Sequence, residues 1–269
     1  MKRLYTGPFS AVFRDVWIER ARTMAHHEWL WLLPTRHLLH TVRDRLLAGR
    51  AGVAGVPLLT FDDVAERLIR HIDQNIYTMS PYGRQKLIEQ LLERYAHDEH
   101  LAVFRPIIDQ PGLARSLAHA IGEMKRAGLS EVAVGGYLEK RGREKGGEPR
   151  QRALAFLFLR YQEELHRADA QGLRVDPEER LRLACEALER HNGNTDTPFA
   201  NIRTLWVDHF TDFTPLQMRL LRSLVRLSAE VGIYVPFPEA KSQELPQLAA
   251  QLAETVRTLA SVGVEHVRL

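Results

Sequence analysis

The chain is poor in cysteine and has no long apolar segment. Its 269 residues include one cysteine, Cys185, which excludes an internal disulfide and any zinc or iron–sulfur site built from cysteines within this chain. The densest apolar run, WLWLLP, stops at Pro34, far short of the ~20 residues that cross a bilayer. The first residues, MKRLYTG, lack the apolar segment and cleavage site of a signal peptide. We therefore expect no membrane partner and a cytoplasmic location. We expect Cys185 to be a small apolar residue buried on a helix.

Lysine is also scarce, because 31 of the 37 basic residues are arginine. The formal net charge is only +3, since 34 acidic residues offset them. Arginine suits phosphate because its planar fork can donate two hydrogen bonds. A dedicated DNA-binding domain is usually more basic than this, so composition permits contact with nucleic acid without establishing it.

Both ends of the chain alternate between short apolar runs and amphipathic stretches. We expect strands at residues 3–7, 29–34, 56–61, 203–208, 231–237 and 264–269. Helical patterns lie between them, at residues 8–25, 35–49, 62–72, 214–230 and 242–263. Strand and helix in alternation predict a parallel sheet covered by helices.

The middle of the chain, from residue 80 to about 192, contains almost only helical patterns. The whole layout predicts an α/β fold with one parallel sheet, built from both ends of the chain and interrupted by a large α-helical insertion. We expect the first part of the sheet domain at residues 1–78, the insertion at 79–194, and the second part of the sheet domain at 195–269. The working loops should follow the carboxyl ends of the strands.

The loop after the first strand, TGPFSAVFRD, is a degenerate phosphate loop. A working loop needs glycines, whose neighbours' N–H groups wrap the phosphates, and a lysine followed by serine or threonine. Here Gly7 is present and Ser10 can cap the following helix, but the second glycine and the lysine are missing. Arg14 lies about two turns into the expected helix and should not reach the loop. ATP and Mg²⁺ are therefore not expected as cofactors.

The stretch LWVDHFTDFTP, residues 205–215, ends a predicted buried strand with Asp208. In an ATPase the acid at this place orients Mg²⁺, and an adjacent acid polarises the attacking water. Asp208 suits the first task, but His209 is a poor substitute for the second. Together with the missing lysine, this predicts that hydrolysis fails for two independent reasons.

Two further loops are candidate DNA contacts. Thr35 and Arg36 begin a helix at a strand end, where they can hold a nucleic-acid phosphate; the alternative is a helix cap followed by a solvated arginine. Thr60 is a helix cap, and Phe61 can stack on a base or pack against its own helix. The histidine pairs His37/His40 and His97/His100 have ligand-like spacing but no third ligand, so no metal site is predicted.

Four stretches in this order resemble a known family, although each alone is weak. They are LLPTRHLLHTVRDRLL, VPLLTFDDVAERLI, ALAFLFLRYQEELHRADAQGLRVDPEERLRLA and LWVDHFTDFTPLQMRLLRSLV. Their order resembles the N-terminal part of the AddB/RexB-type subunit of bacterial ATP-dependent helicase/deoxyribonuclease. Members of this family carry a superfamily-1 helicase-like region followed by a PD-(D/E)XK nuclease domain.

The resemblance implies a RecA-like fold of the P-loop NTPase type for residues 1–78 and 195–269, with the helical block inserted. It implies that a second helicase half and the nuclease domain, with an iron–sulfur cluster in many members, lie beyond Leu269. Some members keep an intact phosphate loop, and this sequence departs from them at Gly7–Ser10. The implied partners are single-stranded or duplex-end DNA and an AddA-like motor subunit.

Together these expectations describe a helicase-like part, without ATPase activity, of a subunit that processes DNA ends in double-strand break repair and guides or scans single-stranded DNA. Two alternatives stay open. One is an active ATP-binding domain with an unusual phosphate loop, and the other is a structural module that docks on a partner and touches no DNA.

Overall fold

The computed structural model describes residues 1–7, 12–49, 55, 57–143, 148–167, 173–190, 197–236, 246–261 and 263–268. The chain divides into two compact units. Met1–His71 and Leu183–Leu269 form the first, called the sheet unit below, and Ile72–Arg182 form the second, the helical unit. Both divisions lie N-terminal of the borders expected at residues 78 and 194.

The sheet unit is an α/β structure, which confirms the predicted class. Its six strands are β1 (Lys2–Gly7), β2 (Trp29–Leu32), β3 (Leu58–Leu59), β6 (Thr204–Asp208), β7 (Glu230–Pro236) and β8 (Glu265–Arg268). Their order in the sheet is β3-β2-β6-β7-β1-β8, and each pair of neighbours is parallel. The sheet is thus built from both ends of the chain, as predicted.

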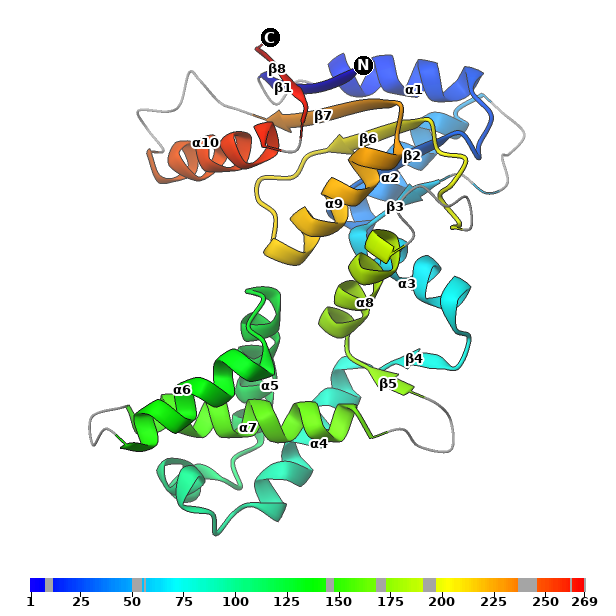
Figure 1. Cartoon of the computed structure of the whole chain (residues 1–269). Coiled ribbons are helices and arrows are strands. Elements are labelled where there is room, and N and C mark those ends of the chain that lie inside the picture. Colours follow the sequence, from blue (N-terminus) through cyan, green and yellow to red (C-terminus); the bar gives the residue numbers. More distant parts are fainter. Residues whose placement is uncertain are drawn as a thin grey trace. The chain divides into compact units, whose positions relative to one another are not determined.

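The helices of this unit cover both faces of the sheet. They are α1 (Val12–Thr23), α2 (Arg36–Leu47), α3 (Phe61–Ile72), α9 (Pro215–Leu227) and α10 (Pro246–Ala260), and α8 (Pro177–Arg190) crosses from the helical unit. Figure 1 shows α1 on one side of the sheet and α9 and α10 on the other. Sequence signals begin several of them: Thr214 and Gln217 form a capping box before α9, and Pro215 follows at its first position.

The four tryptophans of the chain meet under α1. Trp29 and Trp31 on β2 and Trp206 on β6 are almost fully buried, and Trp17 of α1 packs on them. The rings of Trp17 and Trp206 are stacked with centroids 6.0 Å apart. Gly232 on β7 makes room for this packing, since a Cβ there would lie 2.9 Å from Trp17.

The helical unit has its own core and confirms the helical middle of the chain. Its elements are β4 (Ile76–Thr78), α4 (Pro81–Arg94), the 3-10 helix η1 (Glu99–Ile107), α5 (Pro111–Arg126), α6 (Glu131–Arg143), α7 (Pro149–Leu165), β5 (Leu173–Val175) and the start of α8. Leu91, Phe158 and Tyr161 are among its fully buried side chains.

The pairing of β4 with β5 was not predicted from the sequence. These two short strands form a second, parallel sheet in which Ile76 faces Leu173 and Thr78 faces Val175. Three-residue runs are too short to show a strand period, and the two strands fall on either side of the border expected at residue 78. Across the described residues, no helix is both long and apolar enough to span a membrane.

Candidate functional site

The carboxyl ends of the parallel strands lie at one edge of the sheet, where the candidate loops follow them. Gly7 ends β1 beside Pro236 at the end of β7, and Asp208 ends β6 beside Tyr234. The structure therefore brings Gly7, Asp208 and His209 to the same edge. Ser10, the other residue of the predicted degenerate nucleotide site, lies outside the described residues.

Asp208 is a buried carboxylate whose two oxygens are both engaged by its own chain. Its side chain is 2% exposed and pairs with Arg14, whose Nε lies 3.1 Å from Oδ2. Its other oxygen, Oδ1, lies 2.5 Å from Nδ1 of His209. A buried carboxylate needs such partners because desolvation of an unpaired charge is costly.

His209 adopts an uncommon backbone conformation to make these contacts. Its φ is 63°, in the left-handed region that few residues other than glycine occupy, although histidine does so more often than most. Arg14 Nη2 lies 2.8 Å from Nδ1 and 2.9 Å from Nε2 of the His209 ring, and Nδ1 also contacts Asp208 Oδ1. Strain of this kind persists where the surroundings hold the residue in place.

Arg14 contacts Asp208 at the end of β6, a contact that was not predicted from the sequence. Helix α1 comprises Val12–Thr23, so Arg14 belongs to its first turn instead of its second. The same cluster acts on Tyr234: burial raises the pKa of this phenol, and the negative charge of Asp208 raises it further.

The residues present do not fit a Mg²⁺ site at Asp208. Mg²⁺ requires oxygen ligands in near-octahedral geometry, and both carboxylate oxygens of Asp208 already accept from Arg14 and His209. The guanidinium also places a positive charge where a metal ion would approach the acid. Arg14 therefore supplies, within the chain, the positive charge that a strand-end acid would otherwise take from a metal.

Thr35 and Arg36 lie at the start of α2, after β2. The Thr35 hydroxyl accepts a hydrogen bond from the Leu38 N–H at 3.3 Å and so caps the helix. The Arg36 side chain is 80% exposed, and its only ion pair among the described residues is a long one, 3.4 Å to Asp63. This arrangement matches the helix-cap alternative, and it leaves the guanidinium accessible to a phosphate.

Thr60 and Phe61 are used inside the fold. The Thr60 hydroxyl donates to Asp63 Oδ2 at 2.8 Å and accepts from the Asp63 N–H at 3.2 Å, so the predicted helix cap is confirmed. Phe61 is 3% exposed and packs edge-on against Phe210 and Phe213. This burial favours the packing alternative for Phe61 over base stacking.

The cysteine and histidine residues show no metal centre within the described part of the chain, where no three His, Cys, Asp or Glu side chains converge. Cys185 is fully buried, as predicted, and burial raises the pKa of its thiol to about 12. His100 is held by Asp98 and stacks on Phe156 with centroids 4.8 Å apart.

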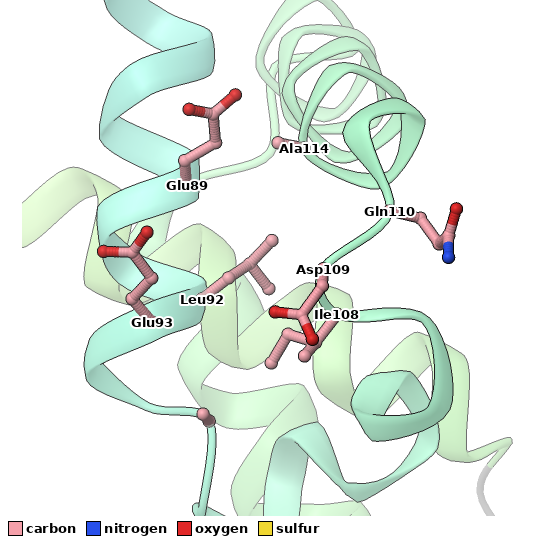
Figure 2. Close-up of a pocket in the computed structure, with 8 residues that line it drawn as sticks. Glu89, Leu92, Glu93, Ile108, Asp109, Gln110 and Ala114 are labelled. Atoms are coloured by element: carbon pink, nitrogen blue, oxygen red, sulfur yellow. The ribbon is translucent and has the colours of Figure 1, made fainter.

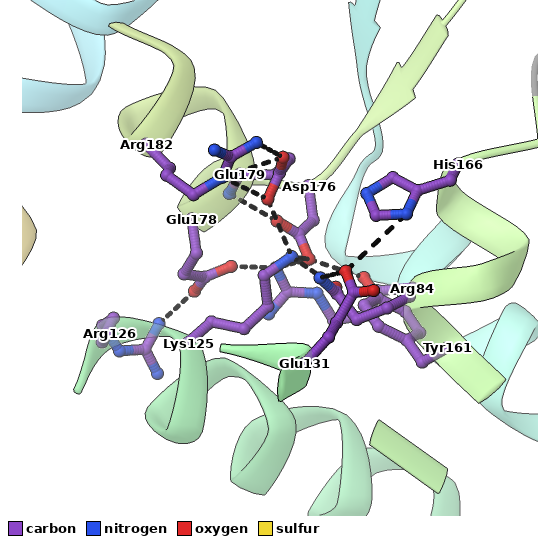
Figure 3. Close-up of polar contacts among 11 residues, drawn as sticks. Arg84, Lys125, Arg126, Glu131, Tyr161, His166, Asp176, Glu178, Glu179 and Arg182 are labelled. Atoms are coloured by element: carbon purple, nitrogen blue, oxygen red, sulfur yellow. Dashed lines mark hydrogen bonds and ion pairs between the residues drawn. The ribbon is translucent and has the colours of Figure 1, made fainter. Parts of the chain in front are cut away.

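A second buried charged cluster lies in the helical unit and was not predicted from the sequence. Asp176 is 0% exposed and its Oδ2 lies 2.7 Å from Nζ of Lys125, which is itself buried. Its other oxygen caps α8 by accepting from the Glu179 N–H at 2.7 Å. Figure 3 shows that side chains of α4, α5, α7 and α8 converge on Asp176, the residue before α8: Arg84, Lys125, Arg126, Tyr161, Glu178, Glu179 and Arg182.

Comparison with known proteins gives a consistent result. Residues 13–266 match a family model described as "ADDB, N-terminal". The chain is 25% identical over 77% of its length to the B subunit of an ATP-dependent helicase/deoxyribonuclease from Thermoanaerobacter sp. (strain X514). It is 29% identical over 69% of its length to the protein of that name from Pelotomaculum thermopropionicum, and 32% identical over 51% to that from Moorella thermoacetica.

The matched region is a small part of each relative. The chain covers 16% of the Thermoanaerobacter protein, 15% of the Pelotomaculum protein and 11% of the Moorella protein. The helicase and deoxyribonuclease named in their descriptions therefore belong to much longer chains.

Proposed function

Because the chain belongs to the family of AddB N-terminal regions, we propose that it is the helicase-like part of a DNA end-processing helicase/deoxyribonuclease subunit and does not hydrolyse ATP. The observation that supports the absence of ATP hydrolysis is the Arg14–Asp208–His209 cluster, in which both carboxylate oxygens of Asp208 are engaged. A strand-end acid with both oxygens engaged lacks a free ligand for the metal on which ATP hydrolysis depends.

The RecA-like identity of the sheet unit is part of the same proposal. It is supported by the parallel sheet, by the loops gathered at its carboxyl edge and by the family membership. In such sheets ligands bind outside the carboxyl ends of the strands. The phosphate loop lacks the lysine that would hold a nucleotide phosphate. The proposal is that this edge binds the phosphates of a DNA backbone instead.

Among the loops at that edge, the start of α2 is the best candidate for a contact with DNA. The first turn of α2 contains no acid and begins with the exposed Arg36, so its N–H groups and guanidinium both favour a phosphate. The start of α3 is less suitable because Asp62 and Asp63 lie in its first turn. The Thr35–Arg36 loop is therefore proposed as the contact that guides single-stranded DNA, within a complex whose motor activity resides in an AddA-like partner subunit.

The test uses Arg36→Gln, with Arg226→Gln as the matched control. Arg226 is also exposed but lies in the last turn of α9, before β7 begins, at the opposite edge of the sheet. Binding of single-stranded oligonucleotide is measured by fluorescence anisotropy at several salt concentrations. Arg36→Gln should weaken binding and lower the salt slope by about one, whereas Arg226→Gln should leave both unchanged. An unaltered slope in Arg36→Gln would contradict the proposed contact.

The alternative of an active ATPase predicts that ATP with Mg²⁺ stabilises the folded protein. Millimolar ATP and Mg²⁺ should leave the Tm of the wild-type chain unchanged if the proposal is right. The alternative of a module without DNA contact predicts no oligonucleotide binding by the wild-type chain at low salt.

A further inference from the structure

A cavity in the helical unit has no role in the proposed site. It has a volume of about 500 Å³ and lies between α4, the end of η1 and the start of α5. Leu92, Ile108 and Ala114 provide an apolar floor, and Glu89, Glu93 and Asp109 provide carboxylates around it. Its volume falls within the roughly 300–1,000 Å³ of ligand pockets.

Two of these three carboxylates make no ion pair with any other described side chain. Glu89 is satisfied, because it accepts from Gln85 at 2.9 Å and from Lys86 at 2.6 Å. The ion pair with Lys86 lowers the pKa of Glu89. Glu93, one turn further along α4, and Asp109, on the loop before α5, are exposed. Figure 2 shows Asp109 extending toward Leu92, whereas Gln110 extends away from the floor of the cavity.

The surroundings favour a positively charged group with an apolar stem. Arg105 makes no ion pair with these carboxylates; its guanidinium donates to the carbonyls of Ala96 and His97, which follow α4. The apolar side is continued by Ile107, which is 45% exposed next to Ile108. Lysine and arginine bury their aliphatic stems along such a surface while the charged head reaches a carboxylate.

Other occupants fit less well. The carboxylates repel a nucleic-acid phosphate, so this surface is not suited to DNA. They are spread over two elements, and among the described residues no three potential ligands lie close enough for a metal ion.

We propose that this cavity, the α4–α5 cavity, receives an arginine or lysine side chain from an exposed segment of a partner protein chain. The proposal rests on the proposed function only in taking the chain to be one subunit of a complex. The stem of the side chain lies over Leu92 and Ile108, and its head lies between Glu93 and Asp109. The protein-binding surface is then separate in sequence from the DNA contact at Arg36.

The first experiment uses two blocked peptides as probes, acetyl-Leu-Arg-Leu-amide and its nearly isosteric, uncharged counterpart acetyl-Leu-citrulline-Leu-amide. The reporter is a fluorophore on Gln110→Cys, at the rim. Labelling is selective, because Cys185 is fully buried and the pKa of its thiol is about 12. The variants are Glu93→Gln/Asp109→Asn and, as a control, Glu139→Gln, an exposed acid of α6 outside the cavity lining.

The arginine peptide should bind the wild-type cavity saturably and at least fivefold more tightly than the citrulline peptide. This preference should fall below twofold in Glu93→Gln/Asp109→Asn and stay unchanged in Glu139→Gln. Equal binding of both peptides to the wild type, or a preference that survives in the double variant, would overturn the proposal. Far-ultraviolet circular dichroism of each variant shows whether the fold is retained.

The second experiment measures affinity for the purified motor subunit with Glu93→Lys/Asp109→Lys. A loss of tenfold or more supports the proposal, and an unchanged affinity rejects a protein partner at this cavity. Binding of single-stranded oligonucleotide by the same variant should not fall. If instead the wild-type chain binds no oligonucleotide, the proposed DNA contact fails while the result with the motor subunit still stands.

Discussion

Asp176 in the helical unit and Asp208 in the sheet unit occupy the same local position with different consequences. Each follows or ends a parallel strand, in the segments LRVD and LWVD, and the side chain of each is at most 2% exposed. Asp208 is engaged by one arginine and its neighbouring histidine at the edge of a six-stranded sheet. Asp176 is engaged by Lys125, Tyr161 and the first turn of α8.

The comparison teaches that an acid at a strand end does not identify a nucleotide site. Asp208 stands out in the sequence because its strand is long and apolar, whereas Asp176 does not, because its strand is short. In both places the surrounding cations decide the role of the acid. Asp176 holds three helices together, whereas Asp208 is paired with Arg14 and His209 at the end of β6.

The largest expected effect is on the Asp176 side of the comparison. Asp176→Ala leaves the buried Lys125 with Glu179 at 3.7 Å as its nearest acid and removes the cap of α8. Breaking a buried ion pair in this way costs about 3–5 kcal/mol, measured as the free energy of unfolding in urea. Asp176→Asn keeps an oxygen that can cap the helix and should cost less; equal losses would mean that the cap contributes nothing.

Arg14→Ala tests the other acid. It leaves Asp208 buried with His209 alone, and the loss of one charged partner should lower the free energy of unfolding by about 2–3 kcal/mol. Because the variant frees Oδ2 of Asp208, 10 mM Mg²⁺ should restore about 1 kcal/mol, an effect absent in the wild type and in Arg14→Ala/Asp208→Asn. Equal responses to Mg²⁺ in all three proteins would contradict the view that Arg14 takes the place of a metal.

The fold of the sheet unit was predictable because its signals are local and repeated. Strands such as WLWLLP and LWVD are bounded by turns and separated by helices with caps, so element type and parallel pairing followed from period and order. The cap at Thr60 and the burial of Cys185 were predictable for the same reason. Contacts between residues that are distant in the sequence were not predictable. Examples are the contacts of Arg14 with Asp208, of Phe61 with Phe210, and of Lys125 with Asp176, which are 51 residues apart.

Gly232→Ala tests the packing that supports the Asp208 edge. The added Cβ would lie 2.9 Å from Trp17 and 3.2 Å from Trp206, and overpacking of this kind costs about 1–3 kcal/mol. All four tryptophans lie in this cluster, so their fluorescence should shift with the loss of Tm. Gly136→Ala on α6 is the matched control, because its Cβ would meet nothing within 4 Å, and alanine favours a helix over glycine by about 1 kcal/mol.

The smallest effect on the free energy of unfolding is expected for an ion pair whose charges are exposed, in contrast to the buried acids Asp176 and Asp208. Arg20 and Glu230 form an ion pair with side chains 44% and 36% exposed, and the hydrogen bond from Arg20 lowers the pKa of Glu230. A carboxyl whose pKa is lowered on folding contributes stability above its unfolded pKa and loses it as the pH falls. Glu230→Gln should therefore cost less than about 1 kcal/mol at pH 7, and the difference from wild type should vanish near pH 3. A difference that persists at pH 3 would mean that packing, and not charge, gives this pair its effect.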